Sequence, residues 1–446
     1  MPTRPLSWPV SSKESARRLG NALSSAQLSL LHPVADEATA RGLPLYLVGG
    51  FVRDLLLRQP SLDLDLVVEG DAIALASALA KNHGGKITAH KRFGTAQWFL
   101  PDSLLGARHP ALDFISARSE TYPRPGALPV VKPGSLADDL RRRDFTINTL
   151  ALRLDGSHFG ELHDELGGRD DLEKGVVRVL HPNSYRDDPT RILRAVRYAG
   201  RYGFRITPKD LALIRAAKPQ LGGLSGERLR HELDLILAEE KAAAMLSRLA
   251  GLELLAEIHP SLAWDDSLRP LFEKLDQPEP DSWHGAPNLA RLPRRVALGY
   301  LLWLSDLDPA LIESLAARLD FTASLREALL ASASLHNDLA CLANAKPSAI
   351  TARLNEVPLL AVCALSLEST SLNESVKESV ERYLSCWRHV KPKTTGHTLQ
   401  KLGLSPGPAY SAILSRLKNA WLDGEIHTAE EEKNLLEQLR ESTIRT

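Results

Sequence analysis

Two aspartates, Asp63 and Asp65, stand two positions apart in LDLDLVVEG (residues 62–70), a stretch otherwise rich in leucine and valine. Such a stretch is typical of a buried strand, where an isolated carboxylate is costly to bury. Because side chains alternate along a strand, we expect Asp63, Asp65 and Val67 on one face and the leucines on the other. A divalent cation would relieve the repulsion between the acids, and Mg²⁺ takes one or two carboxylates together with substrate phosphates. A solvent-facing strand with two incidental acids is the alternative.

The preceding stretch, LYLVGGFVRDLLL (45–57), predicts a strand, two glycines and the start of a helix. Gly49 and Gly50 would let backbone amides approach a ligand closely, and a helix N-terminus offers N–H groups to phosphate. Arg53 could bind a phosphate oxygen from the first turn, while Asp54 could hold Arg53 or a sugar hydroxyl. This order of elements before a D-x-D strand indicates nucleotide chemistry better than either part alone.

The elements that must position these residues change character near residue 155. Strand-like runs precede it, and helix-like periodicity dominates after it. The expected strands are 45–50, 62–68, 94–100, 111–117 and 149–154, and residues 71–85 predict a helix that ends in two glycines. The sequence therefore predicts an α+β fold, with an N-terminal α/β head containing a mixed sheet of about five strands, followed by an all-helical neck, body and tail. We predict a head at 1–155, a neck at 156–245, a body at 246–390 and a tail at 391–446.

The composition is that of an ordinary globular protein. The chain has 446 residues, 43% hydrophobic and 25% charged, with a formal net charge of zero. Any nucleic-acid partner would have to be attracted by local basic surfaces. The three cysteines form no C-x-x-C pair, the N-terminus lacks a signal-peptide pattern, and no apolar run approaches the ~18 residues of a membrane span. These features predict a cytoplasmic protein without disulfides, a zinc site or a membrane partner.

The stretch GGFVRDLLLRQPSLDLDLVV (49–68) resembles the signature of class II nucleotidyltransferases of the DNA polymerase beta superfamily. More narrowly, it is similar to the bacterial tRNA nucleotidyltransferase (CCA-adding) and poly(A) polymerase family. Further motifs of that family follow in order, including KRFGTA (91–96), and a weaker match lies in the tail. In DFISARSETY the resemblance makes Asp113 the candidate third catalytic carboxylate, on a strand next to Asp63 and Asp65. An acid at a strand edge is the alternative.

The stretch LRRRDFTINTLAL (140–152) matches the R-R-D-x-x-x-N motif of the same family. The resemblance implies that Arg142 and Arg143 contact the nucleotide triphosphate. It also implies that Asp144 and Asn148 contact the ribose. The chemistry fits, because guanidinium groups pair with phosphate oxygens and Asp and Asn can hydrogen-bond the sugar hydroxyls. A solvated helix end is the alternative.

The stretch RDDPTRILRAVRYAGRYGF (186–204) predicts a helix with Asp188 at its N-cap and Gly203 just beyond its end. Four arginines gather within roughly 120° of its circumference, on a basic face that is either solvated or functional: Arg191, Arg194, Arg197 and Arg201. The resemblance implies that Asp188 and Arg191 read the incoming base, and Arg194 is assigned to nucleotide binding with them. Asp187 occupies a position where relatives more often have Glu, and its role stays open.

One Asp–Arg pair can select two of the four bases. Arg can donate to O2 and N3 of cytosine, or to N1 of adenine, while Asp accepts from the exocyclic amine of either base. Uracil and guanine place an oxygen where that amine would be, so an acceptor would face an acceptor. An unpaired buried contact of this kind is costly enough to discriminate strongly.

The function that the resemblance implies is template-independent addition or repair of the 3′-terminal CCA of tRNA from CTP and ATP. Asp63 and Asp65 would hold two Mg²⁺ ions, and pyrophosphate would be released. The expected partners are tRNA, CTP and ATP, with no DNA and no membrane. Three alternatives remain: an enzyme that adds only CC or only A, a bacterial poly(A) polymerase, and an inactive RNA-binding relative. The segment 119–137 is not obviously shortened, which disfavours CC-only addition, and the absence of a strongly basic extension disfavours poly(A) synthesis.

Overall fold

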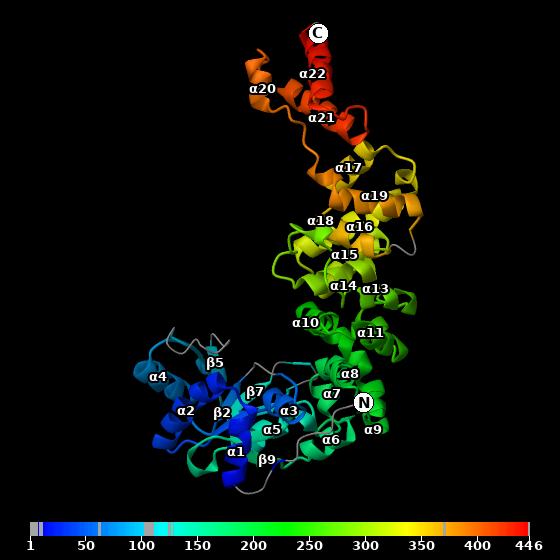
Figure 1. Cartoon of the computed structure of the whole chain (residues 1–446). Helices are drawn as coiled ribbons and strands as arrows, with labels where there is room; N and C mark the ends of the chain where they lie inside the picture. Colours follow the sequence, from blue (N-terminus) through cyan, green and yellow to red (C-terminus); the bar gives the residue numbers. More distant parts are fainter. Residues whose placement is uncertain are drawn as a thin grey trace. The chain divides into compact units, whose positions relative to one another are not determined.

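The computed structural model describes Trp8 and residues 12–60, 64–101, 111–123, 126–127, 129–368 and 372–444 (Figure 1). The predicted metal ligand Asp63 lies outside these described residues. The chain divides into two compact units, Met1–Leu224 with Leu252–Ile258, and Ser225–Gly251 with His259–Thr446. The boundary after Leu224 falls within the predicted neck, and the four-domain division stays a prediction.

The first unit is built around a seven-stranded sheet with strand order β3-β4-β5-β2-β1-β8-β9. Its strands are β1 (Leu45–Val48), β2 (Asp65–Val68), β3 (Lys86–His90), β4 (Thr95–Phe99), β5 (Ala111–Ser116), β8 (Ala151–Arg153) and β9 (Glu161–His163). β2 and β5 pair in parallel and the other neighbours are antiparallel, so the predicted mixed sheet is confirmed. All five predicted strands are present, and β3 and β9 extend the sheet at its two edges. Four of the five residues of β3 are exposed, so that strand carries no apolar alternation.

The two faces of the sheet are covered differently. On one face α4 (Ala72–His83) contacts β3, β4 and β5, and α2 (Ser25–Ala40) lies against α4. On the other face, α5 (Leu136–Arg141) packs over β1, β2 and β8, in a cluster that contains Tyr46, Val48, Val67, Leu136, Leu140 and Ala151. Within the described part of the sheet, Asp65 and Asp113 therefore share a face with this second cluster, since they alternate with Leu66 and Phe114.

The rest of the first unit connects the sheet to a group of helices. These elements are α1 (Ser12–Ala22), α3 (Gly50–Leu56), a hairpin of β6 (Arg118–Thr121) and β7 (Val130–Pro133), the 3₁₀ turn η3 (Thr146–Asn148), α6 (Gly168–Lys174), α7 (Ser184–Asp187), α8 (Thr190–Tyr202), α9 (Pro208–Ala217) and α12 (Leu254–Ile258). A two-stranded parallel sheet joins β10 (Val176–Val177) to β11 (Arg205–Ile206). The prediction that everything after residue 155 is helical is wrong for β9, β10 and β11. These strands are too short to show the alternation of apolar and polar residues that identifies a strand in the sequence.

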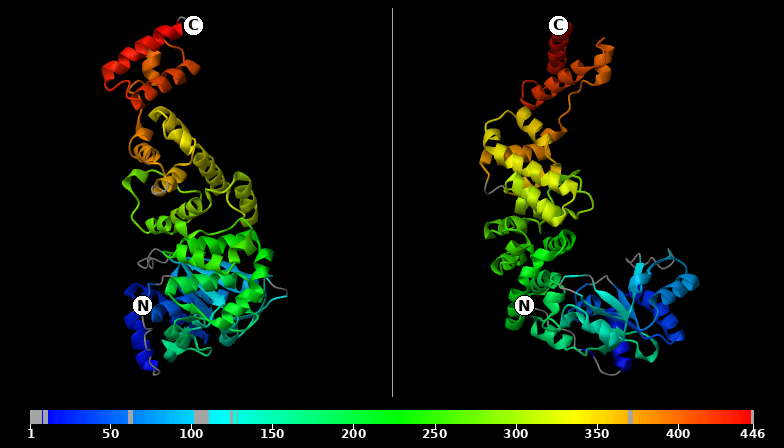
Figure 2. Two further views of the ribbon diagram at one scale, coloured as in Figure 1. Left: turned by 90° about the vertical axis from the view of Figure 1, so that its right-hand side faces the viewer. Right: turned by 180° about the vertical axis from the view of Figure 1, so that it is seen from behind.

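The second unit consists of helices, short 3₁₀ turns and loops throughout its described residues (Figure 2). Its α-helices are α10 (Gly226–Leu237), α11 (Ala242–Gly251), α13 (Arg269–Lys274), α14 (Arg294–Leu304), α15 (Pro309–Leu319), α16 (Ala323–Leu342), α17 (Pro347–Asn355), α18 (Leu359–Leu367), α19 (Glu374–Ser385), α20 (Gly396–Lys401), α21 (Pro408–Leu422) and α22 (Ala429–Ile444). Over the described ranges, no single helix has the length and apolar composition of a membrane span, although α17 and α18 together, bent by 118°, meet those criteria.

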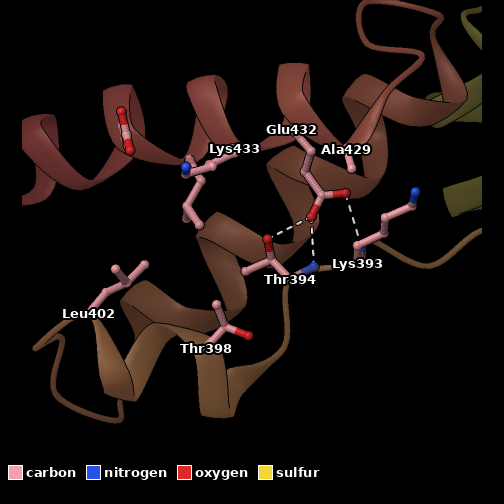
Figure 3. Close-up of a pocket in the computed structure, with 9 residues that line it drawn as sticks. Lys393, Thr394, Thr398, Leu402, Ala429, Glu432 and Lys433 are labelled. Carbon is pink, nitrogen blue, oxygen red and sulfur yellow. Dashed lines mark hydrogen bonds between the residues drawn. The ribbon is translucent and has the colours of Figure 1, made fainter.

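The last three helices of the second unit have a small core of their own, in which Leu399, Ile413, Leu417 and Leu436 are buried. A buried carboxylate ties this core to the segment before it. Glu432 accepts hydrogen bonds from the backbone N–H groups of Lys393 (3.0 Å) and Thr394 (2.6 Å) and from the Thr394 hydroxyl (Figure 3). The indole of Trp421 donates to the same carboxylate. Lys393, Thr394 and Glu432 are among the residues that line a pocket of about 270 Å³.

Candidate active site

The acid pair lies where two parallel strands begin. The register sets Asp65 of β2 directly opposite Asp113 of β5, so both carboxylates project from the same face. Asp65 is partly buried and Asp113 is exposed, and Gln97 of β4 donates to Asp113 Oδ1 at 3.1 Å. Strands in a sheet are about 4.8 Å apart, so two neighbouring carboxylates repel each other and provide the oxygen ligands that hard divalent cations prefer. The donor set therefore suits a divalent metal ion, although the described residues contain no group of three or more candidate ligands.

The glycine turn reaches the same end of the sheet, because β1 is antiparallel to β2 and Val48 ends β1 where β2 begins. Gly49 has a φ of 69°, and a Cβ atom on it would lie 2.5 Å from Nη1 of Arg143. Its own N–H donates to the Leu150 carbonyl at 3.0 Å, so this amide is already bonded within the protein. The glycine is thus needed for the close approach of the Arg143 guanidinium and for its positive φ.

Arg53, predicted to bind phosphate, is buried in a set of contacts within the protein. Its Nε and Nη2 donate to Asp54 at 2.8 and 3.0 Å, and its Nη1 donates to Asn148 Oδ1 at 2.5 Å. The rings of Tyr198 and Tyr202 lie 5.0 and 4.8 Å from its guanidinium carbon. Of the two roles predicted for Asp54, holding Arg53 is observed, and direct phosphate binding by Arg53 stays a prediction.

Asp144, Asn148 and Arg194 continue this chain of polar contacts to α8. Asn148 Nδ2 donates to Asp144 Oδ1 at 2.8 Å, and Arg194 donates to Asp144 Oδ2 through Nε at 2.9 Å and Nη2 at 2.7 Å. Burial raises the pKa of Asp144, but the positive charge of Arg194 and these hydrogen bonds outweigh it and lower the pKa to about 2. Asp144 is therefore an anion at neutral pH. The structure thus brings five predicted residues into one connected chain: Asp54, Arg53, Asn148, Asp144 and Arg194.

Arg142 and Arg143 have different surroundings although they are adjacent. Arg142 pairs with Asp139 and, at 3.1 Å, with Glu120. Arg143 donates to Asp139 at 2.9 Å, and its Nε is buried without a hydrogen-bond partner. A buried donor without a partner is costly, which is the signal expected of a group that binds an anionic ligand. Arg143 is thus the stronger phosphate-binding candidate of the two.

The predicted base-reading residues lie at the start of α8. The Asp188 carboxylate accepts from the Thr190 backbone N–H at 3.1 Å and from its hydroxyl at 2.6 Å. The N-cap of α8 is Pro189, so the predicted N-cap position is wrong by one residue, although the Asp188 carboxylate does bond the first turn. Arg191 is buried, and it donates to the Ser184 hydroxyl and, at 2.8 Å, to the Arg142 carbonyl. Both side chains are therefore oriented by neighbours within the protein.

Tyr122 is a neighbour of both base-reading residues that the sequence did not single out. Burial raises the pKa of its hydroxyl to about 12, and the charges of Arg191 and Asp188 both act on it. The loop that follows it is held to the same place, since Gly126 N–H donates to the Asp187 carbonyl at 3.1 Å. The part of Asp187 that the loop contacts is thus its backbone, and the role of its side chain stays open.

Comparison with known proteins identifies family models for two parts of the chain. Residues 45–178 match the family model described as "Poly A polymerase head domain", and residues 203–265 match "Probable RNA and SrmB- binding site of polymerase A". An A-adding tRNA nucleotidyltransferase of Halalkalibacterium halodurans is 32% identical over 95% of this chain and 94% of its own. The chain belongs to the tRNA nucleotidyltransferase family. A CC-adding tRNA nucleotidyltransferase of Deinococcus radiodurans is 33% identical over 88% of each chain. The solved Thermotoga maritima CCA-adding enzyme complexed with tRNA is 28% identical, with a TM-score of 0.76 over 96% of this chain and 98% of that one.

Several residues of this tRNA nucleotidyltransferase site carry no sequence motif that could have identified them. Tyr198 and Tyr202 sit four residues apart on α8, a spacing that places them on one helix face. Asp139 of α5 pairs with both Arg142 and Arg143, and Glu120 of β6 pairs with Arg142. The helical spacing of the tyrosines was a usable signal, whereas the acids act through contacts that only the fold creates.

Proposed function

We propose that this tRNA nucleotidyltransferase adds or repairs the 3′-terminal CCA of tRNA from CTP and ATP, without a nucleic-acid template and with release of pyrophosphate. The observation that carries the proposal is the in-register pair Asp65 and Asp113 at the sheet end where Arg143 approaches Gly49. Acids that can hold a metal ion thus lie at the same sheet end as a guanidinium whose Nε is buried without a hydrogen-bond partner.

The metal ion is proposed to be Mg²⁺, held by Asp63 and Asp65 with Asp113 beside them. When bound, it would lower the pKa of the RNA 3′-hydroxyl and neutralise charge on the triphosphate. Arg143, with Arg142, would bind the triphosphate. Asp144, as an anion, would accept a hydrogen bond from a ribose hydroxyl, and Asn148 would hold Asp144 in place.

Selection of cytosine and adenine is proposed to rest on Asp188 and Arg191. Thr190 bonds the Asp188 side chain, and Ser184 and the Arg142 carbonyl bond that of Arg191. Both side chains are therefore ordered before a base binds. Pre-orientation of this kind gives strong discrimination, because a wrong base would leave a buried acceptor facing an acceptor. The proposed compartment is the cytoplasm, in keeping with three cysteines that are all free.

A narrower activity, addition of the terminal A alone, is the second candidate. It is favoured by the A-adding relative, which matches 95% of this chain. The assay that separates the two supplies tRNA ending at the discriminator base, at C or at CC, with CTP, ATP or both. Three-nucleotide products from the shortest tRNA would support CCA synthesis.

Extension of only the CC-ended tRNA would establish A addition, and extension of only the two shorter ones would establish CC addition. Open-ended A tracts on unrelated RNA would instead indicate a poly(A) polymerase. The control is UTP and GTP in place of CTP and ATP, which should yield no extension with the correct tRNA.

A further inference from the structure

On the face of the sheet that carries Asp65 and Asp113, the described side chains of β3 and β4 are exposed or only partly buried. We name as the β3–β4 surface the side chains that the register places on that face beyond Asp113: Lys86, Thr88, His90, Gln97 and Phe99. Gln97 pairs with Asp113 on one side and Thr88 on the other, so these residues form a continuous row from the acid pair to the sheet edge. The row is thus part of the same surface as the catalytic candidates.

The β3–β4 surface is exposed, whereas α4 covers the opposite face of the same strands. Lys86, Thr88, His90 and Phe99 are all exposed, and 40% of the surface of Phe99 is accessible. The alternating residues Ala96 and Trp98 are buried on the α4 side. The exposed ring offers a flat apolar surface on which a nucleic-acid base can stack.

Basic groups lie at both ends of this surface. Lys86 lies directly opposite Phe99 in the β3–β4 register, and the turn at the other end of the hairpin, beyond His90, adds Lys91 and Arg92, both exposed. Basic side chains interleaved with an aromatic platform suit single-stranded nucleic acid, where bases stack and phosphates are neutralised.

The order of the strands also indicates which substrate would bind to the β3–β4 surface. The groups proposed to bind the triphosphate and ribose follow β1 or precede β8, so they lie on the β1 side of the acid pair. Arg191 and Arg194 of α8 bond to two of them, Arg142 and Asp144. The 3′-hydroxyl of the RNA must reach the same acids, and the β1 side is occupied by the nucleotide and α5. The remaining approach is from the β4 side, across the β3–β4 surface.

We propose that the β3–β4 surface binds the unpaired 3′-terminal nucleotides of the RNA acceptor strand. Phe99 stacks on a base, Lys86 and His90 bind phosphates, and Gln97 holds Asp113 at the end of the row. This assignment rests on the proposed function for its choice of RNA, but it makes a separate claim about binding that needs no catalysis.

The test is a binding measurement on the full chain by fluorescence anisotropy. The probe is an RNA minihelix of acceptor stem and T arm with a three-nucleotide 3′ overhang, compared with the same minihelix ending at its last base pair. Phe99→Leu should weaken binding of the overhang RNA by about 5- to 100-fold, the range for loss of one base-stacking contact, and leave the blunt RNA unchanged. The conservative variant Phe99→Trp should retain binding of the overhang RNA, because an indole can also stack on a base. Lys86→Ala should weaken binding of the overhang RNA and reduce the salt dependence of that binding.

Lys81→Ala is the matched control, because Lys81 is exposed on α4, over the opposite face of the sheet. It should change neither affinity. Equal losses on the two RNAs, or no loss on either, would overturn the assignment. Nucleotide addition by the wild-type chain is measured in parallel. If the chain adds no nucleotide, the proposed function fails, while the overhang comparison still decides whether this surface binds RNA ends.

Discussion

Replacing Gly49 by alanine should weaken nucleotide binding by displacing the Arg143 guanidinium. The added Cβ would lie 2.5 Å from Arg143 Nη1, which is the far end of a flexible side chain and can move away. The cost in stability is then mainly backbone strain, because the φ of 69° with a ψ of −126° lies outside the left-handed helical region and is a combination that glycine adopts far more easily than alanine. The displaced guanidinium, however, would no longer occupy its place beside the acid pair.

Gly42→Ala is the matched control. Gly42 has a φ of 63° and no atom within 4 Å of its would-be Cβ, so it carries the backbone strain without the displacement. Both variants should lose free energy of unfolding in urea, so nucleotide affinity is compared under conditions where both are folded. Only Gly49→Ala should lose nucleotide affinity, by about tenfold or more, because a hydrogen bond to a charged group contributes roughly 1.5–3 kcal/mol.

The reasoning is checked by a double-mutant cycle with Arg143→Ala, measured by calorimetric titration of CTP and ATP. If Gly49→Ala acts through Arg143, it should cost little further affinity when the arginine is already gone. Wild-type affinity in Gly49→Ala, or fully additive losses in the double variant, would refute the assignment of Arg143 to the triphosphate.

Three further predictions address the acids, base choice and pH. Asp65→Asn and Asp113→Asn should each reduce nucleotide incorporation by at least about 100-fold while tRNA affinity in a filter-binding assay is unchanged; retained activity would contradict the metal assignment. Asp188→Ala should raise misincorporation of UTP and GTP before it abolishes addition, and unchanged selectivity would remove Asp188 from base reading. Burial lowers the pKa of His336, but its hydrogen bonds to Glu368 and to a backbone carbonyl raise it to about 9, from an ordinary 6.5. Its contribution to stability is therefore full below pH 6.5 and is lost as the pH rises through 9, so His336→Gln should flatten the decline in urea midpoint across that interval.

Much of the sheet could be predicted because the strands that carry the site alternate or are continuously apolar. LDLDLVV and ALDFIS have this pattern, and both form strands at the expected place. The strand KITAH lacks it, because β3 is an edge strand exposed on the site face. The direct opposition of Asp65 and Asp113 could not be predicted, since the register of two strands far apart in the chain is set by tertiary packing.

The site residues were predictable as a set but their contacts were not. The spacing of R-R-D-x-x-x-N indicated polar chemistry, yet it could not reveal that Arg53 would lie between Tyr198 and Tyr202 from a helix some 145 residues later. Arg53 has protein partners for its Nε, Nη1 and Nη2 atoms, whereas Arg143 pairs through Nη2 and its Nε has none. Whether an arginine donor has a partner within the protein depends on which elements pack together, and the sequence motif alone does not contain that information.

The parallel pairing of β2 with β5 has a consequence for how the enzyme becomes active during folding. It is the one parallel pairing among the described strands of the seven-stranded sheet, and α4, β3 and β4 lie between β2 and β5 in the chain. Contacts between distant parts of a chain form later than local ones, because loop-closure entropy must be overcome first. Asp65 and Asp113 should therefore meet only after the local helices and hairpins have formed, so a partly folded head could have those elements in place and yet lack catalytic activity.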